Sequence, residues 1–419
     1  MDYIRRAIEP ILQRSGRTFK TVLVTGPRQV GKTTVLRETF KGTPETTFDD
    51  KMQLRSAKED PALFLRDNPP PRILDEVQYA ADLFPEIKIV CDRAKEYGRY
   101  FLTGSQQFNM MKNVSETLAG RAAIHELQGL SMREIKAAEF NRPFVPTDEY
   151  FEERKRSLYR FDDIWHHIHR GSNPELQNPE IDWSTYWSSY VKTYMERDVR
   201  QLINIKDETA FLTFLTSVAA RTGQMLNYSA VADEVGKTAV TIKEWVSVLQ
   251  ASGLVYLMQP YSSSVLTRAI KTPKIYFRDT GLVSHLTRWL TPEALRAGAL
   301  NGNVFETFVV SEIIKSFANA GRDPGFGIYY YRGKDKNRVR RNGMTESYES
   351  EIDMIIEENG TLYPIEIKMT ASPKASMADA FDILDADVTK KRGKGAIICL
   401  YDKLIHLKEN LVAVPLEYI

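Results

Sequence analysis

The chain has 419 residues, of which 42% are hydrophobic, and its 57 basic and 55 acidic side chains give a net charge of +2. This length exceeds one ordinary domain, and the composition is that of a folded protein rather than a disordered one. The near-neutral charge excludes a general attraction to polyanions, so any nucleic-acid surface is expected to be a local patch.

The N-terminus and the cysteines indicate the compartment. The first residues, Met1 to Arg6, lead into no apolar signal core, and no apolar run reaches the length needed to span a membrane. Cys91 and Cys399 lie far apart and show neither CxxC nor zinc-binding spacing. We therefore expect a cytoplasmic protein without a membrane partner.

A phosphate-binding loop is predicted after the apolar strand Thr21–Thr25, where the sequence reads G-P-R-Q-V-G-K-T before a likely helix. Glycines allow a tight turn that points backbone N–H groups at a polyphosphate. Lys32 can reach the β- and γ-phosphates, and the Thr33 hydroxyl can bind Mg²⁺. We expect ATP and Mg²⁺ as cofactors. The residues expected to bind the nucleotide are Gly26, Pro27, Arg28, Gln29, Val30, Gly31, Lys32, Thr33 and Thr34.

A second motif follows about forty residues later, where the short apolar strand Ile73-Leu74 ends in Asp75-Glu76. Asp75 can hold the water shell of Mg²⁺, and Glu76 can polarise the attacking water. Alone this string is weak, because many strands end in a solvated acidic pair. Its position after the phosphate loop favours a nucleotide-hydrolysis site with Lys32 and Glu76 as catalytic residues.

Three further side chains each have a functional and a structural interpretation. Ser105 follows the strand candidate Arg99–Thr103 and could sense the γ-phosphate, or it could be an ordinary turn residue. Arg121, next to Gly120, could be a surface charge, or in an oligomer it could reach a neighbour's nucleotide. Arg197 could touch the nucleotide from a helical lid or form a surface ion pair.

The middle of the chain predicts helices and then a winged helix. Prolines and charges at 140–185 indicate loops between short helices, and the aromatic stripe that follows is expected to pack. Over 211–258 the order is helix, tight turn, helix and strand, with Thr238 as N-cap of the second helix. Lys237 and Lys243 are the expected DNA contacts, although a structural or protein-binding wing fits this modestly basic helix equally well. Asp279 is expected to cap a helix or turn.

The last part of the chain holds a candidate metal site. In the strand Ile365–Met369, Glu366 and Lys368 point to one face, and the turn at 358–360 can bring Asp353 beside them. Asp353 and Glu366 could bind Mg²⁺, Lys368 could stabilise developing phosphorane charge, and Glu306 could complete the site from a helix. An alternating charged strand that faces solvent would look the same.

Basic residues cluster in sequence around this candidate site, before Asp353 and again at 390–394. Each run could be a solvated loop. Their place next to a candidate metal site favours contacts to the phosphate backbone of a nucleic acid, and we expect such contacts from three of them in particular: Arg338, Arg340 and Arg341.

The motifs together resemble those of one group of proteins. T-G-P-R-Q-V-G-K-T-T, I-L-D-E-V-Q, L-T-G-S and L-A-G-R resemble the archaeal-type AAA+ ATPases of prokaryotes, of the AAA_14 group, which carry a winged helix and a nuclease-like C-terminal domain. The order Glu306, Asp353, Glu366, Lys368 resembles the restriction-endonuclease-like fold, PD-(D/E)xK. The resemblance also implies that Arg121 is an arginine finger.

The expected fold class is therefore α/β and multidomain. The expected limits are 1–140 for a P-loop AAA+ core, 141–205 for a helical lid or linker, 206–290 for the winged helix, and 291–419 for the nuclease-like domain. We expect a homo-oligomer that hydrolyses ATP and acts on structured or branched DNA, with a metal-dependent nuclease site. The alternative is a nucleotide-switched scaffold that binds DNA or protein without nuclease activity.

Overall fold

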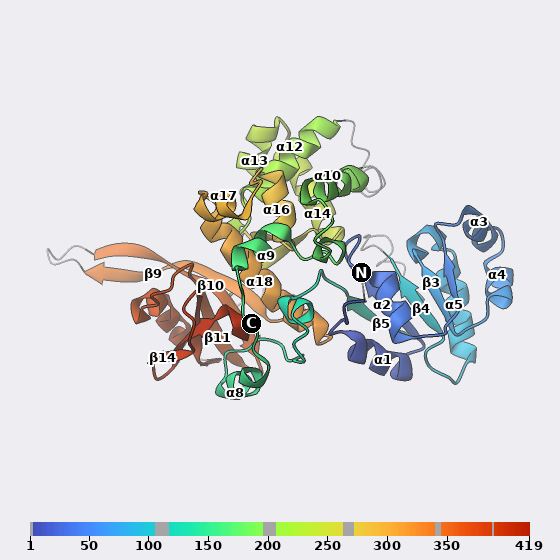
Figure 1. Ribbon diagram of the computed structural model, residues 1–419, viewed down its shortest axis with the longest axis horizontal. Helices are drawn as coiled ribbons and strands as arrows, with labels where there is room; N and C mark the ends of the chain where they lie inside the picture. The colour runs from blue at the N-terminus through green and yellow to red at the C-terminus, as the bar shows by residue number, and fades with distance from the viewer. Residues whose placement is uncertain (1–2, 105–116, 196–206, 263–271, 340–344, 388) are drawn as a thin grey trace.

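The structure, a computed structural model, describes residues 3–104, 117–195, 207–262, 272–339, 345–387 and 389–419. Figure 1 shows the N-terminal part in blue at one end and the C-terminal part in orange and red at the other, with helices from the middle of the chain between and above them. Within the described residues the strands form a five-stranded and a ten-stranded sheet. The mixed α/β, multidomain fold class is thus confirmed.

The N-terminal part is built on the smaller sheet. Its elements are α1 (Glu9–Thr18), β1 (Thr21–Thr25), α2 (Lys32–Thr39), β2 (Glu45–Thr47), α3 (Lys51–Glu59), α4 (Pro61–Asp67), β3 (Arg72–Asp75), η1 (Val77–Ala80), α5 (Leu83–Arg93), β4 (Tyr100–Thr103) and β5 (Ala122–Glu126). The strands pair in parallel in the order β2-β3-β4-β1-β5. Leu23 of β1 packs in one apolar cluster while Val22 and Val24 pack in another, because helices cover both faces of the sheet.

Short helices link this sheet to the rest of the chain. They are α7 (Met132–Ile135), α8 (Asp148–Arg154), η2 (Lys155–Ser157), α9 (Ile164–Arg170), η3 (Glu175–Gln177) and α10 (Trp183–Tyr194). Helix α8 lies on the C-terminal end of the chain: Tyr150 Oη donates to the carbonyl of Tyr418 at 2.7 Å, and Arg154 Nη2 donates to that of Glu417 at 2.7 Å. The first part of the segment expected as a helical lid or linker, from 141, therefore contacts the C-terminal part of the chain.

The next segment carries the helix and strand order expected for 211–258. Its elements are α12 (Glu208–Ala219), β6 (Gln224–Met225), α13 (Tyr228–Val235), α14 (Ala239–Ala251), β7 (Val255–Pro260), β8 (Lys274–Phe277), α16 (Thr280–Leu286) and α17 (Pro292–Ala297). Thr238 caps α14 as predicted, since its Oγ1 accepts a hydrogen bond from Thr241 N. Asp279 caps α16 in the same way.

The C-terminal part follows the order helix, three strands, helical turns and strands. Its elements are α18 (Asn301–Asn319), β9 (Ile328–Val339), β10 (Thr345–Glu358), β11 (Thr361–Ile367), η5 (Ala375–Ala386), β12 (Lys391–Arg392), β13 (Gly395–Cys399), β14 (Ile405–Lys408), β15 (Leu411–Pro415) and η6 (Leu416–Tyr418). Helix α18 is the longest helix of the described residues, and it carries the charged side chains of Glu306, Glu312 and Lys315. Among the described helices none is both long and apolar enough to cross a membrane.

One sheet crosses the expected limit between residues 290 and 291. The strand order is β14-β15-β13-β11-β10-β9-β7-β8-β6, and β12 pairs with β11. The junction is the parallel pairing of β7 with β9, at Gln259 with Tyr329 and Pro260 with Tyr330. The two segments that the sequence predicts as separate domains therefore share a backbone hydrogen-bond ladder, and they are expected to move as one body.

A buried arginine near the N-terminus holds several loops together. Arg6, with 3% of its surface exposed, forms an ion pair of 3.0 Å with Glu134 and donates to the carbonyls of Val30 and Gln128 at 2.8 and 2.7 Å. Burial alone would raise the pKa of the Glu134 carboxyl, but Arg6 and two backbone N–H groups hold that pKa below its ordinary value.

Removal of this guanidinium leaves a buried carboxylate without its cation. We expect Arg6→Met to lower the free energy of unfolding by about 3–5 kcal/mol, as measured by urea unfolding followed by far-UV circular dichroism. The matched control is Arg55→Met. Arg55 pairs with Glu59 where both side chains are more than 60% exposed, so its loss should have a much smaller effect on stability. Equal effects of the two changes would contradict this role of Arg6.

Candidate nucleotide site and C-terminal carboxylate cluster

The loop between β1 and α2 has the backbone geometry of a phosphate-binding loop. Gly26 has φ +142°, and a Cβ there would lie 2.1 Å from the carbonyl oxygen of Leu127. Gly31 adopts the left-handed conformation (φ +88°) directly before α2. Both positions therefore need glycine, the first because of close approach and the second because of its dihedral angle.

Lys32 begins helix α2 at the end of this loop. Its Nζ donates to the carbonyls of Gly26 and Pro27 at 3.2 and 2.8 Å, and the side chain is buried. The backbone N–H groups and the dipole of a helix N-terminus favour a bound anion at the same place. A phosphate in the loop would thus meet a cation and backbone donors together.

The two sequence motifs meet at Asp75, at the end of β3. Its Oδ1 accepts hydrogen bonds from Thr33 Oγ1 at 2.5 Å and from Thr103 Oγ1 at 2.6 Å, while Oδ2 accepts from Thr47 Oγ1 at 3.0 Å. The hydroxyl of Thr33 and the carboxylate of Asp75 are the oxygen donors that Mg²⁺ prefers. The residues present therefore fit a nucleotide-bound magnesium ion.

Glu76 lies next to Asp75 in the left-handed conformation (φ +56°). Its backbone N–H donates to Thr103 Oγ1 at 3.1 Å, and its carboxylate accepts from Gln78 Nε2. Strained backbone of this kind recurs at functional sites. The residue expected to polarise the attacking water thus follows the expected magnesium ligand directly, at the end of β3.

The other residues expected at the nucleotide divide into three groups. The loop residue Gln29 (φ +61°) accepts a hydrogen bond from Tyr186 Oη at 2.9 Å, so α10 touches the loop. Arg121 donates from Nε and Nη2 to the two carboxylate oxygens of Asp92 in α5, which is a contact within the same chain. Ser105 and Arg197 lie outside the described residues. The sensor, lid and finger roles remain predictions.

The C-terminal residues expected to act together do lie together. Glu366 stands one position beyond the Met354–Ile365 pair of the antiparallel β10–β11 ladder, which brings it beside Asp353. Lys368 Nζ is 2.5 Å from Glu366 Oε1 and 3.5 Å from Asp353 Oδ2. Asp353 Oδ2 also accepts from the backbone N–H of Ile367 at 2.9 Å.

These carboxylates are joined by Glu351, which the sequence did not single out. We call the set Glu306, Glu351, Asp353 and Glu366 the carboxylate cluster. Lys274 of β8, with 4% of its side chain exposed, has its Nζ 2.6 Å from Glu351 Oε1, 3.4 Å from Glu306 Oε1 and 4.0 Å from Asp353 Oδ1. Tyr276, two positions along the same strand face, donates from Oη to Glu306 at 2.6 Å.

Burial and mutual repulsion perturb the pKa values of the cluster. Burial, and then the Asp353 carboxylate, raise the pKa of Glu306 to about 7 and that of Glu366 to about 8. Burial alone would lower the pKa of the Lys274 ammonium, but the surrounding carboxylates raise it above its ordinary value. The cluster is therefore a place where protons, lysines or other cations compete for the same oxygens.

The fit of a divalent metal to this cluster is incomplete. Its oxygen donors suit Mg²⁺ or Mn²⁺, and Glu366 Oε2 is buried with no partner among the described residues. Yet no group of three or more Asp, Glu, His or Cys in the described part of the chain is arranged to hold a metal. The ammonium groups of Lys274 and Lys368 contact the carboxylates instead. As arranged, the cluster does not fit a metal ion, and no reaction step follows from one.

The residues expected to contact DNA lie in two places. Lys237 forms an ion pair with Asp207 at 2.8 Å, while Lys243 is exposed on α14 next to the exposed Glu244. Arg338 belongs to β9, the strand that leads to the hairpin tip in Figure 1, and its side chain lies outside the description. Arg340 and Arg341 lie outside the described residues. Their contacts to DNA remain predictions.

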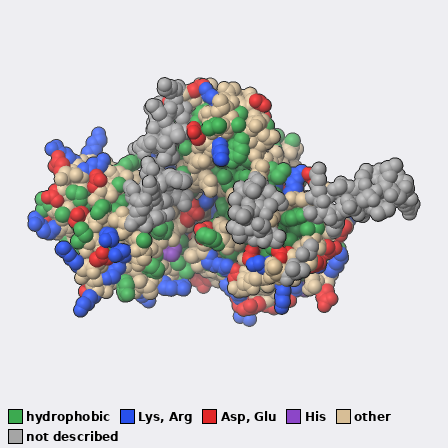
Figure 2. All heavy atoms as spheres, turned by 180° about the vertical axis from the view of Figure 1, so that it is seen from behind, with side chains coloured by type: hydrophobic (Ala, Val, Ile, Leu, Met, Phe, Trp, Pro, Cys, Tyr) green, Lys and Arg blue, Asp and Glu red, His purple; other side chains and the backbone are tan. Residues whose placement is uncertain are grey.

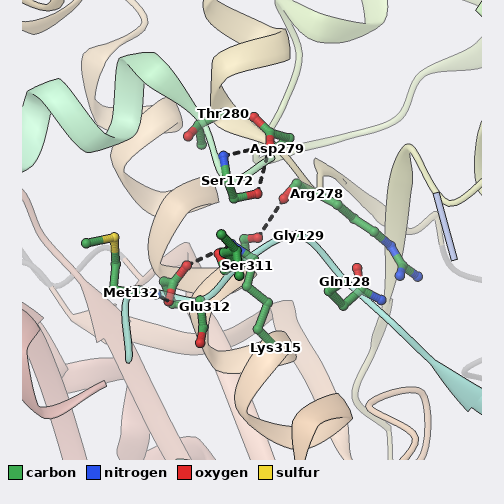
Figure 3. A network of polar contacts seen from close by, with 12 residues as sticks. Gln128, Gly129, Met132, Ser172, Arg278, Asp279, Thr280, Ser311, Glu312 and Lys315 are labelled. Atoms are coloured by element: carbon green, nitrogen blue, oxygen red, sulfur yellow. Dashed lines mark hydrogen bonds and ion pairs between the residues drawn. The ribbon is translucent and has the colours of Figure 1, made fainter. Parts of the chain in front are cut away.

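A polar network joins the linker helices, the end of β8 and helix α18 (Figure 3). Asp279 Oδ2 accepts from both the backbone N–H and the hydroxyl of Ser172, at 2.8 and 2.7 Å. Ser311 Oγ of α18 donates to the carbonyl of Arg278 at 2.8 Å. Glu312 of the same helix accepts from the backbone N–H of Met132 at 2.8 Å. The end of β8 is thus fixed to the linker on one side and to α18 on the other.

A cavity beside this network is lined both by the phosphate-binding loop and by α10. Its lining includes Pro27 of the loop and three buried side chains with a polar atom that has no partner among the described residues, namely Gln128, Asn173 and Trp187. It contains about 20 Å³ of space that water can occupy, which is enough for one water molecule.

Comparison with protein families agrees with the geometry of the N-terminal part. Residues 18–136 match a family described as an AAA domain, and they contain the phosphate-binding loop and Asp75. This part of the chain is a P-loop ATPase domain of the AAA type. Residues 161–293 match a domain of unknown function, DUF8612, and residues 301–419 match another, DUF4143.

Whole-chain comparisons find uncharacterised relatives. Two are uncharacterised proteins of Mycobacterium bovis and Mycobacterium tuberculosis, each 28% identical over 418 residues, or 99% of this chain and 84% of the relative. Among solved structures, the Walker-type ATPase of Pyrococcus abyssi has 14% identity, covers 68% of this chain and 96% of its own, and gives a TM-score of 0.40. A structure described as a DNA replication initiation factor has 13% identity, covers 73% and 91%, and gives 0.30.

The sequence did not identify Glu351 of the cluster, the residues Lys274 and Tyr276 that contact the cluster, or Thr103 of the nucleotide site. A signal existed for Lys274, because a charged residue begins an otherwise apolar strand. Thr103 ends the strand before the expected sensor Ser105, and its hydroxyl, not an expected ligand, orients Asp75. No local pattern pointed to Glu351.

Proposed function

We propose that this chain binds ATP with Mg²⁺, hydrolyses the ATP, and uses the cycle to act on DNA in a structured or branched form. The observation that carries the proposal is the hydrogen bond between Thr33 and Asp75, which joins the phosphate-binding loop to the carboxylate of β3. Thr33 and Asp75 would hold the ion, Lys32 would neutralise the β- and γ-phosphates, and Glu76 would orient the attacking water. A homo-oligomer in which Arg121 reaches a neighbour's nucleotide remains part of the proposal.

The DNA part of the proposal rests on element order and local charge. Helices α12 to α14 followed by β7 and β8 support a winged helix, and the order α18, β9, β10, β11, η5, β13 supports a restriction-endonuclease-like domain. Figure 2 shows basic and acidic side chains interspersed on the face that it presents. Contacts to the phosphate backbone of DNA would therefore come from one local element. We propose the basic β9–β10 hairpin as that element.

A second function is a nucleotide-switched scaffold that grips DNA without cutting it. The specific observation in its favour is Lys274, whose ammonium lies among the carboxylates that a metal-dependent nuclease would need. In this alternative the C-terminal part binds the DNA backbone. The ATPase domain uses ATP to change the position of that part or the assembly state of the protein. The two versions share the nucleotide site and differ at the cluster.

The nucleotide site is tested by Lys32→Ala. Because the substitution removes the cation that neutralises transferring phosphate, we expect ATP turnover to fall by about a hundredfold or more. A coupled phosphate-release assay measures it. The control is Lys41→Ala, which removes a lysine whose side chain is 76% exposed and should leave turnover unchanged. Near-normal turnover in Lys32→Ala would refute the site.

The DNA contact is tested by neutralising Arg338, Arg340 and Arg341 to Gln together. Each lost phosphate contact should reduce the slope of log K against log salt by about 0.9 for duplex DNA, and affinity for all sequences should fall alike. Fluorescence anisotropy at several salt concentrations gives both quantities. The control replaces three exposed basic residues of the N-terminal part, Arg55, Lys58 and Arg66. A triple variant with the wild-type slope would remove the hairpin from the interface.

A DNA-cleavage assay distinguishes the nuclease from the scaffold that binds DNA without cutting it. Labelled linear, forked and four-way DNA are incubated with the full chain and Mg²⁺ or Mn²⁺, comparing wild type with Asp353→Asn and with the exposed control Asp385→Asn. Metal-dependent products that only Asp353→Asn removes would make the protein an ATP-coupled nuclease. If wild type hydrolyses ATP and binds DNA but leaves every substrate intact, we expect the gripping scaffold instead.

A further inference from the structure

Gln78, the last residue of the I-L-D-E-V-Q motif, contacts the carboxylate that is expected to polarise the attacking water. It lies on the 3-10 helix η1, two residues after Glu76. Val77 and Ala80 of the same helix are fully buried in the core of the ATPase domain. Residues three apart share a face of a 3-10 helix, so these two fix one face to the core and Gln78 lies on another.

The side-chain amide of Gln78 has two ends with different surroundings. Its Nε2 donates to Glu76 Oε2, whereas its Oε1 is buried and has no hydrogen-bond partner among the described residues. Because an ionised carboxylate only accepts hydrogen bonds, the amide has to present its NH₂ group to Glu76 and cannot be turned around. Both ends belong to one planar amide. The unpaired oxygen therefore lies next to the Glu76 carboxylate.

This oxygen needs a hydrogen-bond donor in the working protein. Burial of an amide oxygen without a hydrogen bond destabilises a folded chain, and such atoms are rare in folded proteins. A water molecule is a suitable donor, since it carries two hydrogens and is small enough to lie between two side chains. The position beside Glu76 is where the water of a nucleotide-hydrolysis site is expected.

The backbone of Glu76 is held relative to the expected magnesium ligand. Glu76 adopts the left-handed conformation (φ +56°), and its N–H donates to Thr103 Oγ1 at 3.1 Å. The same hydroxyl donates to Asp75 Oδ1 at 2.6 Å, and Thr103 is fully buried. Thr103 thus fixes the main chain of Glu76, while Gln78 fixes its carboxylate. The carboxylate is restrained at both ends of the residue.

A water that attacks the γ-phosphorus needs acceptors for its two hydrogens. Its lone pair has to face the phosphorus in line with the leaving oxygen, which turns both O–H bonds away from the phosphate. A carboxylate oxygen accepts one of these hydrogens. A second acceptor beside it stops the water from rotating about the first hydrogen bond. Two neighbouring acceptors therefore hold the water in the orientation from which it reacts.

We propose that Gln78 is a further catalytic residue of the nucleotide site, whose Oε1 accepts one hydrogen of the attacking water while Glu76 accepts the other. The contact from Gln78 Nε2 uses Oε2 of Glu76, which leaves Oε1 of that carboxylate for the water. The two acceptor oxygens then come from one joined pair of side chains. This inference rests on the proposed ATP hydrolysis and adds a second side chain to the site that orients the water.

The hydrolytic step balances with these two groups. The water oxygen bonds to the γ-phosphorus, the bond from that phosphorus to the β–γ bridging oxygen breaks, and ADP leaves with the electron pair. Glu76 accepts one proton of the water and passes it to the products. The other hydrogen stays on the oxygen that becomes part of inorganic phosphate, and Gln78 only accepts a hydrogen bond from it. Gln78 therefore changes the rate of the step and not its proton count.

Gln78→Met removes both ends of the amide and keeps the length of the side chain. In a single turnover of γ-labelled ATP with protein in excess, we expect the rate constant to fall about tenfold or more, because a hydrogen bond to the attacking water is lost. Affinity for the fluorescent analogue mant-AMP-PNP with Mg²⁺ should stay within about twofold of wild type, because the amide acts on the water and not on the nucleotide.

The matched control is Gln177→Met. Gln177 is also half-buried on a 3-10 helix, η3, and its Nε2 donates to the carbonyls of Gly171 and Asn173 at 3.3 and 3.1 Å. Its substitution removes a glutamine of the same kind that has no contact with Glu76. Both the rate constant and the affinity for the analogue should remain those of wild type.

A double-mutant cycle separates an action on the water from support of the local fold. Glu76→Gln removes the carboxylate that accepts the proton, so its rate constant should fall about a hundredfold or more. Because effects of residues that act as a unit on one reacting atom are not additive, Gln78→Met should cost less than about twofold in that background. A side chain that only supports the fold would cost the same in both backgrounds.

The outcomes distinguish this inference from the proposed function. An unchanged or raised rate constant in Gln78→Met, with Glu76→Gln impaired, would overturn the role of Gln78 and leave ATP hydrolysis standing. Additive effects in the cycle would overturn it as well. A wild-type rate constant in Glu76→Gln, or wild type that does not bind the analogue, would refute the hydrolytic site itself and this inference with it.

A second variant covers the case in which Gln78→Met does not bind mant-AMP-PNP. Gln78→Leu removes the same amide with a branched side chain, and the same fall in rate constant at wild-type affinity is expected. Loss of analogue binding in both variants would show that Gln78 supports the fold of the nucleotide site, and it would overturn the proposal.

Discussion

The nucleotide loop depends on a charge that lies outside it. Arg6 donates to the carbonyls of Val30 and Gln128 and pairs with Glu134, so one guanidinium joins the chain start, the phosphate-binding loop and the exit of β5. A guanidinium buried to this extent is stable only when carboxylate and carbonyl oxygens satisfy its donors. The loop cannot change shape without disturbing that set of oxygens. Its conformation is therefore coupled to the segment that leads from β5 to α7, where the three parts of the chain meet.

The elements that the sequence predicted well are those with short-range causes. The glycines at 26 and 31 are needed by a dihedral angle and a close approach within one loop. The turn at 358–360 forces β10 and β11 to pair, and that pairing brings Asp353 beside Glu366. Thr238 caps its helix through a backbone N–H three residues away. Each inference used neighbours in sequence, and each needed only the geometry of a helix, a strand or a turn.

What the sequence could not predict depends on contacts between distant segments. Lys274 meets Glu351 across 77 positions, Arg278 meets Glu126 across 152, and Tyr150 meets Tyr418 across 268. No periodicity or spacing encodes such partners, because each is chosen by how separate elements pack. The contact of helix α8 with the C-terminal end of the chain is of the same long-range kind. Only those long-range contacts show that a lysine lies among the carboxylates of the cluster.

The pairing of β7 with β9 has a consequence for where the chain can be divided. The family match to the C-terminal part begins at residue 301 and leaves β7 and β8 outside. A shortened chain that begins there would lose Lys274, so four carboxylates would face one lysine. It would also remove β7, one of the two neighbours of β9, and leave that edge of β9 open to edge-to-edge aggregation. A soluble C-terminal fragment therefore has to begin before residue 255, so that it takes the strands of the preceding segment with it.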